Sequence, residues 1–239
     1  LRVRNGAGWE GEIEEEFLKP VIKSPRECRS IVVKAEDLKY RLFMCHKSKD
    51  ELKGTKALEY IRWGEKKQYC ERPSCRGRNP WWSLGSQEKP IAIWFKAFND
   101  TFFVPFIPDF NMYVSDRFYV VYPSCKGNWL IALNNILIAL STELHGRANL
   151  GEGALDNMTY EAAMNYIINP MLLESTKIKS REVHNIFTEC GIDPESDIPI
   201  AQQEPNPLPD RKALDDIVFD ALGLTEEERT ILKEGCLIN

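Results

Sequence analysis

Hydrophobic positions follow two different periods along this chain, and each period predicts a different kind of element. From Asn128 to Leu144 apolar residues recur every three or four positions, which is typical of an amphipathic helix, and Gly146 offers an end. A similar spacing between Glu51 and Trp63 predicts another helix. Strands are predicted where β-branched or aromatic residues cluster between polar turns: 31–33, 40–44, 91–95, 101–104 and 117–122. The Asn, Asp and Pro residues between these runs favour short antiparallel pairs.

Two shorter helices are expected before prolines. Residues 10–17 are rich in Glu and predict a helix that Pro20 would end, because proline disfavours helical geometry in the residue before it. Residues 159–168 predict a helix that Pro170 would end in the same way.

The last seventy residues have a different character. Ser180 can cap a helix that runs to Cys190, and the prolines between 194 and 209 then predict an extended linker. The apolar face of 214–222 predicts a helix, and Thr225-x-x-Glu228 is a capping-box pattern that predicts a final one.

These elements together predict an α+β fold, with an antiparallel, β-rich core, several packed helices and a helical carboxy-terminal tail. We expect a first domain over 1–172, a helix plus Pro-rich linker over 173–209, and an acidic helical tail over 210–239.

The composition is that of an ordinary globular protein, with 43% apolar and 28% charged residues in 239. The longest apolar stretch, 129–140, is too short to cross a bilayer, so no membrane is expected as a partner. The chain begins at Leu1 without Met or a signal sequence, and we interpret it as a piece of a longer protein. Seven cysteines without regular spacing favour a reducing cytoplasm over a disulfide framework.

Charge is unevenly distributed, and this changes the functional interpretation. Residues 193–239 carry twelve acidic against four basic residues, whereas 62–96 carry eight Lys or Arg against three Glu. Inside that basic strip, 72–85 combines three arginines with the adjacent Trp81 and Trp82. Arginine fits phosphate oxygens or the edge of guanine, and a base can stack on an indole, so the strip indicates nucleic acid. The alternative is that both tryptophans are core residues with Arg stems packed over them.

Several fragments are similar to catalytic or metal-binding motifs but are incomplete. Asn79-Pro80-Trp81-Trp82 lacks the second proline of the loop with which adenine methyltransferases hold their target, and Gly151-Glu152-Gly153 is a lone Gly-x-Gly. Glu51-Leu52-Lys53 gives the acid-x-Lys triplet of a metal-dependent nuclease without its companion acid. Cys70 and Cys75 have no second spaced pair that would complete a zinc site.

Five blocks of sequence, in the right order, resemble one family. They are Gly8–Glu14 with Phe17–Glu27, Tyr60–Glu65, Arg72–Arg78 with Trp81-Trp82, Gly146–Asp156, and Asp210–Arg229. Over about residues 6–235 the chain resembles the carboxy-terminal target-recognition part of bacterial adenine-specific DNA methyltransferases, including the TaqI-like group and fused restriction-modification enzymes.

The resemblance implies a division of labour between two parts of an enzyme. An amino-terminal methyltransferase domain, absent from this chain, would bind S-adenosylmethionine and carry the catalytic loop, while this part would bind double-stranded DNA as a recognition core and read the target sequence. No cofactor is then expected on this chain, and no catalysis by it alone.

The same resemblance and the chemistry of base reading suggest two DNA-facing surfaces. The first comprises Lys66, Lys67, Arg72, Arg76, Arg78, Trp81 and Trp82. Arg76 and Arg78 are the expected base readers, because a spacing of two puts both on one face of an extended segment, and one of the two indoles is expected in the core. The second surface comprises Arg147, Asn149 and Glu152, although Arg147 could instead bind helix carbonyls or Asp156.

Two other functions remain open from the sequence. The tryptophans and the acidic tail over 210–239 could dock a partner subunit, which would make the chain a protein-interaction module. A stand-alone nuclease using Glu51 is the third hypothesis.

Overall fold

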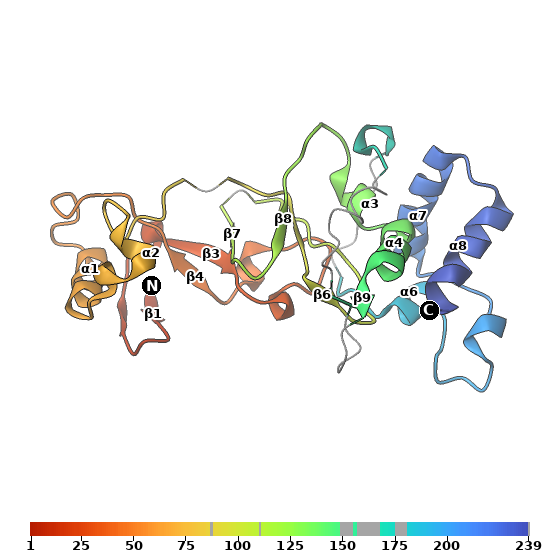
Figure 1. Ribbon diagram of the computed structural model, residues 1–239, viewed down its shortest axis with the longest axis horizontal. Helices are drawn as coiled ribbons and strands as arrows, with labels where there is room; N and C mark the ends of the chain where they lie inside the picture. The colour runs from red at the N-terminus through yellow and green to blue at the C-terminus, as the bar shows by residue number, and fades with distance from the viewer. Residues whose placement is uncertain (87, 110, 149–154, 157–167, 175–180, 239) are drawn as a thin grey trace. The chain divides into compact units, whose positions relative to one another are not determined.

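The computed structural model describes residues 1–86, 88–109, 111–148, 155–156, 168–174 and 181–238, with the backbone alone at 147–148, 155–156 and 233–238. The chain divides into unit 1, made of 1–23, 35–89 and 109–113, and unit 2, made of 24–34, 90–108 and 114–239. Both helices and small antiparallel sheets are present (Figure 1), which confirms the predicted α+β class. The domain boundaries predicted at 172 and 209 stay a prediction.

Two small sheets include the first strands of unit 1. In the first, β1 (Arg2–Arg4) pairs antiparallel with β2 (Glu10–Glu12). The second has the strand order β4-β3-β7, and its strands are β3 (Leu18–Ile22), β4 (Arg41–Phe43) and β7 (Tyr113–Val114). In it, β3 pairs antiparallel with β4. The predicted strand over 40–44 is confirmed. The predicted helix over 10–17 is wrong apart from one 3-10 turn, η1 (Glu15–Phe17).

The strand pairing of unit 1 has a simple electrostatic cause. Arg2 lies opposite Glu12 and Arg4 opposite Glu10, so opposite charges face each other across the pair. Such cross-strand pairs stabilise the strands and here outweigh the helical propensity of Glu. Pro20 ends no helix, since it pairs with Arg41 inside the sheet.

A helical segment follows the strands of unit 1. Helix α1 (Lys56–Lys66) begins after Thr55, whose side chain accepts a hydrogen bond from the Leu58 N–H at 3.2 Å. The predicted helix over 51–63 is therefore confirmed in its second half and extends beyond its expected end. A 3-10 turn, η4 (Tyr69–Glu71), and the single-turn helix α2 (Pro73–Arg76) come next.

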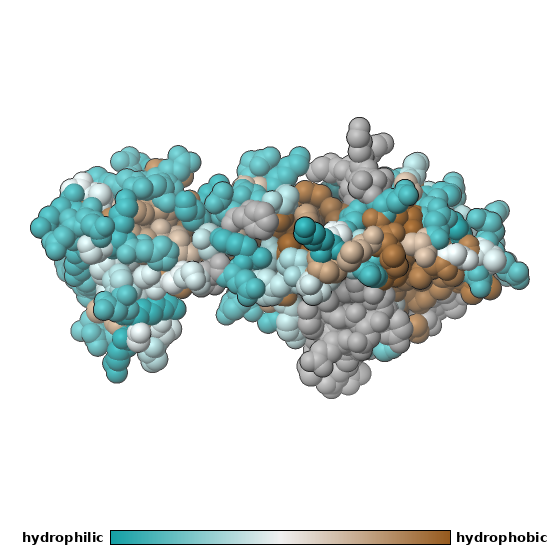
Figure 2. All heavy atoms as spheres, turned by 90° about the horizontal axis from the view of Figure 1, so that it is seen from above, coloured by the Kyte–Doolittle hydropathy of each residue, from teal (hydrophilic) through white to brown (hydrophobic). Residues whose placement is uncertain are grey.

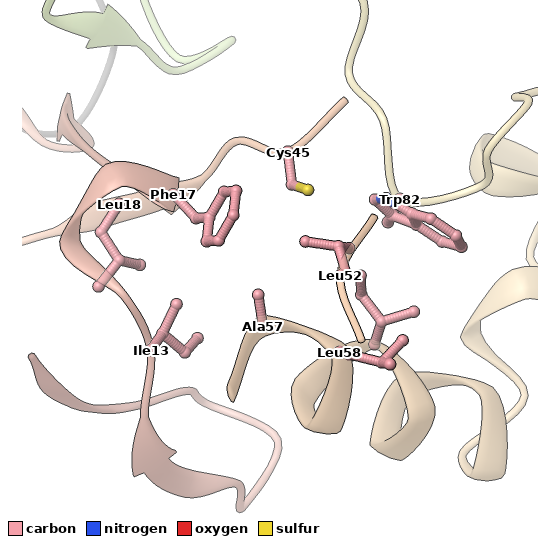
Figure 3. Close-up of a cluster of buried hydrophobic side chains, with 9 residues drawn as sticks. Ile13, Phe17, Leu18, Cys45, Leu52, Ala57, Leu58 and Trp82 are labelled. Atoms are coloured by element: carbon pink, nitrogen blue, oxygen red, sulfur yellow. The ribbon is translucent and has the colours of Figure 1, made fainter. Parts of the chain in front are cut away.

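The core of unit 1 lies between α1 and the strands (Figure 3). Its buried members are Ile13, Phe17, Leu18, Cys45, Leu52, Ala57, Leu58, Ile61 and Trp82. Burial of this apolar face of α1 fixes the orientation of the helix, and so decides which of its side chains reach the surface.

Unit 2 contains two more antiparallel pairings. Strand β5 (Ala92–Trp94) pairs with β8 (Tyr119–Val121), which confirms the strands predicted at 91–95 and 117–122. The other sheet has the order β6-β10-β9, and its strands are β6 (Ala97–Phe98), β9 (Arg147–Ala148) and β10 (Leu155–Asp156). The strand predicted at 31–33 is reduced to a single parallel bridge between Val32 and Phe106, and the strand predicted at 101–104 is not formed. At 104 the reason is visible, because the Asn134 side chain binds both the N–H and the C=O of Val104, at 2.8 and 2.9 Å.

The helices of unit 2 pack against one another in the blue and green part of Figure 1. They are α3 (Trp129–Leu133), α4 (Ile136–His145), α6 (Ile186–Cys190), α7 (Pro209–Leu222) and α8 (Glu226–Ile238). Remaining 3-10 turns are η2 (Pro25–Glu27), η3 (Ala35–Asp37), η5 (Pro170–Leu172) and η6 (Ile200–Gln202). None of the described helices combines the length and the apolar composition that a membrane span requires.

Three helix predictions for unit 2 need comment. The single helix predicted over 128–144 is two helices, because Asn134 leaves the helix to bind Val104 and Asn135 caps α4 by accepting from the Ile138 N–H. The capping box of Thr225 and Glu228 is confirmed by hydrogen bonds in both directions. Helix α6 begins after Asn185, whereas Ser180 and 159–167 lie outside the described residues.

Candidate nucleic-acid interface

A groove of about 490 Å³ opens on the surface of unit 1 beside its strands. Five of its lining side chains are basic and four are aromatic: Arg2, Arg4, Lys23, Lys39 and Arg41, and Trp9, Tyr40, Phe43 and Tyr60. No Asp or Glu is among the described residues that line it. We call it the basic groove.

The cations of the basic groove are only partly neutralised. Arg2 forms an exposed ion pair with Glu10 at 2.9 Å, and Arg41 donates to the backbone carbonyl of Tyr40 at 3.0 Å. Arg4 and Lys39 are exposed, and neither forms an ion pair within 4.0 Å with a described residue. The groove therefore presents a positive surface to solvent.

A row of aromatic rings runs from the groove along α1. Trp9 contacts Tyr60 with ring centroids 4.6 Å apart, and Tyr60 stacks on Trp63 at 5.9 Å with planes 10° apart. Tyr60 and Trp63 are three positions apart and so share one helical face. Trp63 meets the edge of Tyr69 at 5.5 Å, and the Arg72 guanidinium lies 4.0 Å from the centroid of the Tyr69 ring.

This aromatic row forms one wall of a smaller cavity of about 160 Å³, which we call the aromatic pocket. Its lining residues include Phe43, Tyr60, Trp63, Tyr69, Cys75, Arg78 and Trp81. Phe43 and Tyr60 line both cavities, so the basic groove and the aromatic pocket adjoin.

The five basic residues predicted from the strip, Lys66, Lys67, Arg72, Arg76 and Arg78, are all exposed. The extended segment assumed for Arg76 and Arg78 is wrong, because α2 makes a helical turn there and the proline at its first position favours that start. Arg76 turns back to Glu71, donating to its carbonyl at 3.1 Å with its carboxylate at 3.7 Å, whereas Arg78 lines the aromatic pocket. Base reading by either stays a prediction.

The two tryptophans have different environments, as expected. Trp82 is 9% exposed and belongs to the core of unit 1, so the packing interpretation holds for this indole. Trp81 is half-buried, donates from Nε1 to Glu65 at 3.2 Å, and lies so close to α1 that a Cβ on Gly64 would be 2.7 Å from its ring. Trp81 therefore forms a fixed wall of the aromatic pocket.

The second predicted surface cannot be placed. Asn149 and Glu152 lie outside the described residues, and of Arg147 only the backbone is described, in β9. Their contact with DNA stays a prediction.

Sequence reasoning missed the cations of the basic groove, which lie in three separate segments among acidic neighbours. The signal available was the alternation Arg2-x-Arg4 and Lys39-x-Arg41, because a spacing of two puts both side chains on one face of a strand. Local net charge conceals such pairs.

The residues considered for a nuclease or a zinc site make local structural contacts or are free thiols. Glu51 accepts hydrogen bonds from the N–H and hydroxyl of Ser48, at 2.8 and 2.7 Å, and these bonds lower the pKa of its carboxyl. Cys70 and Cys75 are free, half-buried thiols. Among the described residues, no group of three or more His, Cys, Asp or Glu is arranged to hold a metal ion.

Fold and site define a class: a small α+β module with a basic groove, an adjoining aromatic pocket and no assembled catalytic cluster within the described residues. Residues 13–194 match the family model of the type II methyltransferase M.Eco57I C-terminal domain, and the chain belongs to that family. This confirms the resemblance seen in the sequence. Comparisons with curated proteins and with solved structures gave no match.

Proposed function

We propose that this chain is the DNA-recognition part of a bacterial adenine-specific DNA methyltransferase or fused restriction-modification enzyme. The observation that carries the proposal is the basic groove, which combines five cations and four aromatic rings without an acidic lining residue. Double-stranded DNA would be the ligand of unit 1 and would lie along this groove.

The chemistry of the groove suits the two tasks of sequence recognition. Contacts with phosphates position the protein, and contacts with base edges specify the site. The exposed Arg4 and Lys39, with Lys66 and Lys67, would contact phosphates. Arg78 would read bases, because it lies at the aromatic pocket rather than in an internal ion pair.

S-adenosylmethionine, the methyl donor of such enzymes, fits the basic groove poorly. Its sulfonium is positively charged, and the groove concentrates positive charge. We therefore assign the methyl donor to the methyltransferase domain that would precede this one. Purified chain supplied with S-adenosylmethionine and DNA should transfer no methyl group, and measurable adenine methylation would refute this assignment.

A salt titration tests the DNA-binding proposal. These four phosphate contacts predict that the association constant falls roughly 10²-fold between 50 and 200 mM salt, since each contact releases condensed counterions. Fluorescence anisotropy with a labelled duplex measures this dependence. Absence of binding at 50 mM salt, or binding that salt leaves unchanged, would overturn the proposal.

A second candidate function is docking of a partner protein, and exposed apolar side chains on unit 2 favour it. Leu144, Leu222 and Ile231 are 62%, 46% and 59% exposed, and Figure 2 shows hydrophobic atoms on the face of unit 2 in view. The methyltransferase domain of the same enzyme is the proposed partner. This association should barely respond to salt, which separates it from DNA binding in unit 1.

A further inference from the structure

The aromatic pocket has features that binding of DNA phosphates does not require. Its walls are rings of Tyr60, Trp63, Tyr69 and Trp81, and its volume is about 160 Å³. An apolar cavity of about 150 Å³ is large enough to bind benzene. The pocket therefore has room for one planar ring, which could stack against the aromatic side chains.

The charges around the pocket indicate whether a cationic or a neutral ligand would bind in it. Aromatic walls also attract cations, but here the Arg72 guanidinium already covers Tyr69 at 4.0 Å and Arg78 lines the cavity. Among the described residues, the carboxylate that bonds to these walls is that of Glu65, which accepts from Trp81 and is also paired with Lys49 at 2.6 Å. A cationic guest would meet like charge, whereas a neutral planar ring attached to a phosphate would be favoured.

We propose that the aromatic pocket stacks a single unpaired nucleobase of the DNA that lies in the adjoining basic groove. This inference rests on the proposed function and adds the ligand of a second site. The ring of the base would lie against the aromatic walls, and the donors of Arg78 would reach the acceptor edge of the base. The pocket would thereby favour DNA in which one base is already outside the stack, since the cost of unstacking is then removed.

Three duplexes of equal length test the proposal: one fully paired, one with a single bulged adenine, and one with a bulged abasic residue. The last two carry the same phosphate charge and differ only in the base. The complete chain should bind the bulged adenine roughly tenfold more tightly than the abasic bulge, by anisotropy at fixed salt, because base stacking on aromatic side chains has about this effect.

Two matched variants locate the effect. Cys75→Phe fills the pocket from its lining without changing charge, whereas Ser74→Phe puts the same ring on an exposed neighbour outside the lining. Cys75→Phe should abolish the preference for the bulged adenine and keep binding to the paired duplex, while Ser74→Phe should keep both. Tyr69→Leu, which removes one aromatic wall, should also reduce the preference. It provides a second test if Cys75→Phe does not fold.

The outcomes distinguish the two proposals. Equal affinity of the unmodified chain for the adenine and abasic bulges would overturn the pocket but leave the groove as a DNA site. A preference that persists in both Cys75→Phe and Tyr69→Leu would place the base elsewhere and also overturn it. Absence of binding to all three duplexes would refute the proposed function itself.

Discussion

Units 1 and 2 use their charged residues in opposite ways. Unit 1 has 17 Lys or Arg against 14 Asp or Glu, a net charge of +3, whereas unit 2 has 14 against 22, a net charge of −8. In unit 1 five of the cations line an open groove. In unit 2 the strongest ion pairs are internal, and they connect segments of the fold.

The internal network of unit 2 centres on two arginines. Arg181 binds Glu189 in a bidentate pair at 2.7 Å and also contacts Asp210 at 2.7 Å, and its hydrogen bonds lower the pKa of the Asp210 carboxyl. Arg211, 6% exposed, pairs with the buried Asp215 at 3.0 Å. The acidic character of the last 47 residues is thus partly structural, because two of these carboxylates, Asp210 and Asp215, form internal bonds from α7.

The comparison indicates that ligand binding depends less on the net charge of a unit than on which charged side chains lack an internal partner. An exposed cation without an internal partner is available to pair with a charged ligand. The two charges of a buried ion pair stay together, because separating them would leave an uncompensated charge in the protein interior. Binding should therefore depend on the available cations of unit 1, and folding on carboxylates that the fold holds in internal bonds. Three changes of charge test this contrast, and a fourth change tests the wall of the aromatic pocket.

The largest effect is expected from Asp215→Ala. Asp215 accepts from the Ile136 N–H at 2.7 Å and from Arg211, so its loss leaves a buried cation and a buried N–H without this carboxylate. We expect the free energy of unfolding to fall by about 3–5 kcal/mol. Urea unfolding followed by circular dichroism measures it.

Asp216→Ala is the matched control for that change. Asp216, the next residue, is half-buried; it pairs with the exposed Lys212 at 2.6 Å and lies 3.9 Å from the Arg229 guanidinium. A helical pair of this spacing contributes only about 0.3–0.5 kcal/mol, so a small loss of stability is expected. Equal losses in the two variants would mean that burial does not distinguish the charges of unit 2.

The second effect is on DNA binding and concerns unit 1. Replacing Arg4 and Lys39 together by Gln should reduce the slope of log affinity against log salt by about 2, because each phosphate contact contributes about 1. Lys34 and Lys126 are exposed residues of unit 2, and their double replacement by Gln removes the same charge. An equal loss of slope in both double variants would show that only total charge matters.

The spacing of hydrophobic residues predicted most of the helices and strands whose formation depends on residues close in sequence. The strands at 91–95 and 117–122 and the capping box of Thr225 and Glu228 are present, because their residue patterns act over short distances. The failures depend on distant partners. The pairing of 10–12 with Arg2–Arg4 removes one helix, and the binding of Asn134 to Val104 divides another.

The site was predictable to a similar extent. The basic strip over 62–96 was recognised because its basic and aromatic residues are adjacent in sequence, and part of it lines the aromatic pocket. The basic groove was not recognised, since Arg2–Arg4 and Lys39–Arg41 are brought together only by the fold. Unit 1 is itself assembled from three separate segments, and no local pattern reveals such a division.

The third effect concerns the wall of the aromatic pocket. Gly64→Ala would place a Cβ 2.7 Å from the Trp81 ring, so the indole must move and its hydrogen bond to Glu65 is disturbed. We expect a loss of about 1–2 kcal/mol of stability, despite the higher helix propensity of Ala, because overpacking costs about 1–3 kcal/mol. Gly77→Ala, where a Cβ meets nothing within 4 Å, is the control and should be nearly neutral. Shifted Trp fluorescence in Gly64→Ala alone would confirm the cause.

The smallest effect separates a structural carboxylate of unit 1 from its exposed neighbour. Partial burial opposes ionisation of Glu14, but hydrogen bonds from the N–H groups of Lys56 at 2.7 Å and Ala57 at 3.0 Å outweigh it, so the pKa of Glu14 is lowered. A lowered pKa means that this stabilisation is present above the unfolded value, 4.5, and is lost as the pH falls through the folded value.

Glu14→Gln should therefore cost about 0.5–1 kcal/mol at pH 7, in the range of a lost helix cap, and progressively less as the pH falls below the unfolded value of 4.5 and through the folded pKa. Glu15→Gln, at an exposed position, removes the same charge next to it and should change stability little at either pH. Urea unfolding at pH 7 and pH 3.5 measures both variants. If the two lost equal stability at pH 7, net charge alone would govern unit 1, and the contrast between available and structural charges would fail in the unit where it matters for binding.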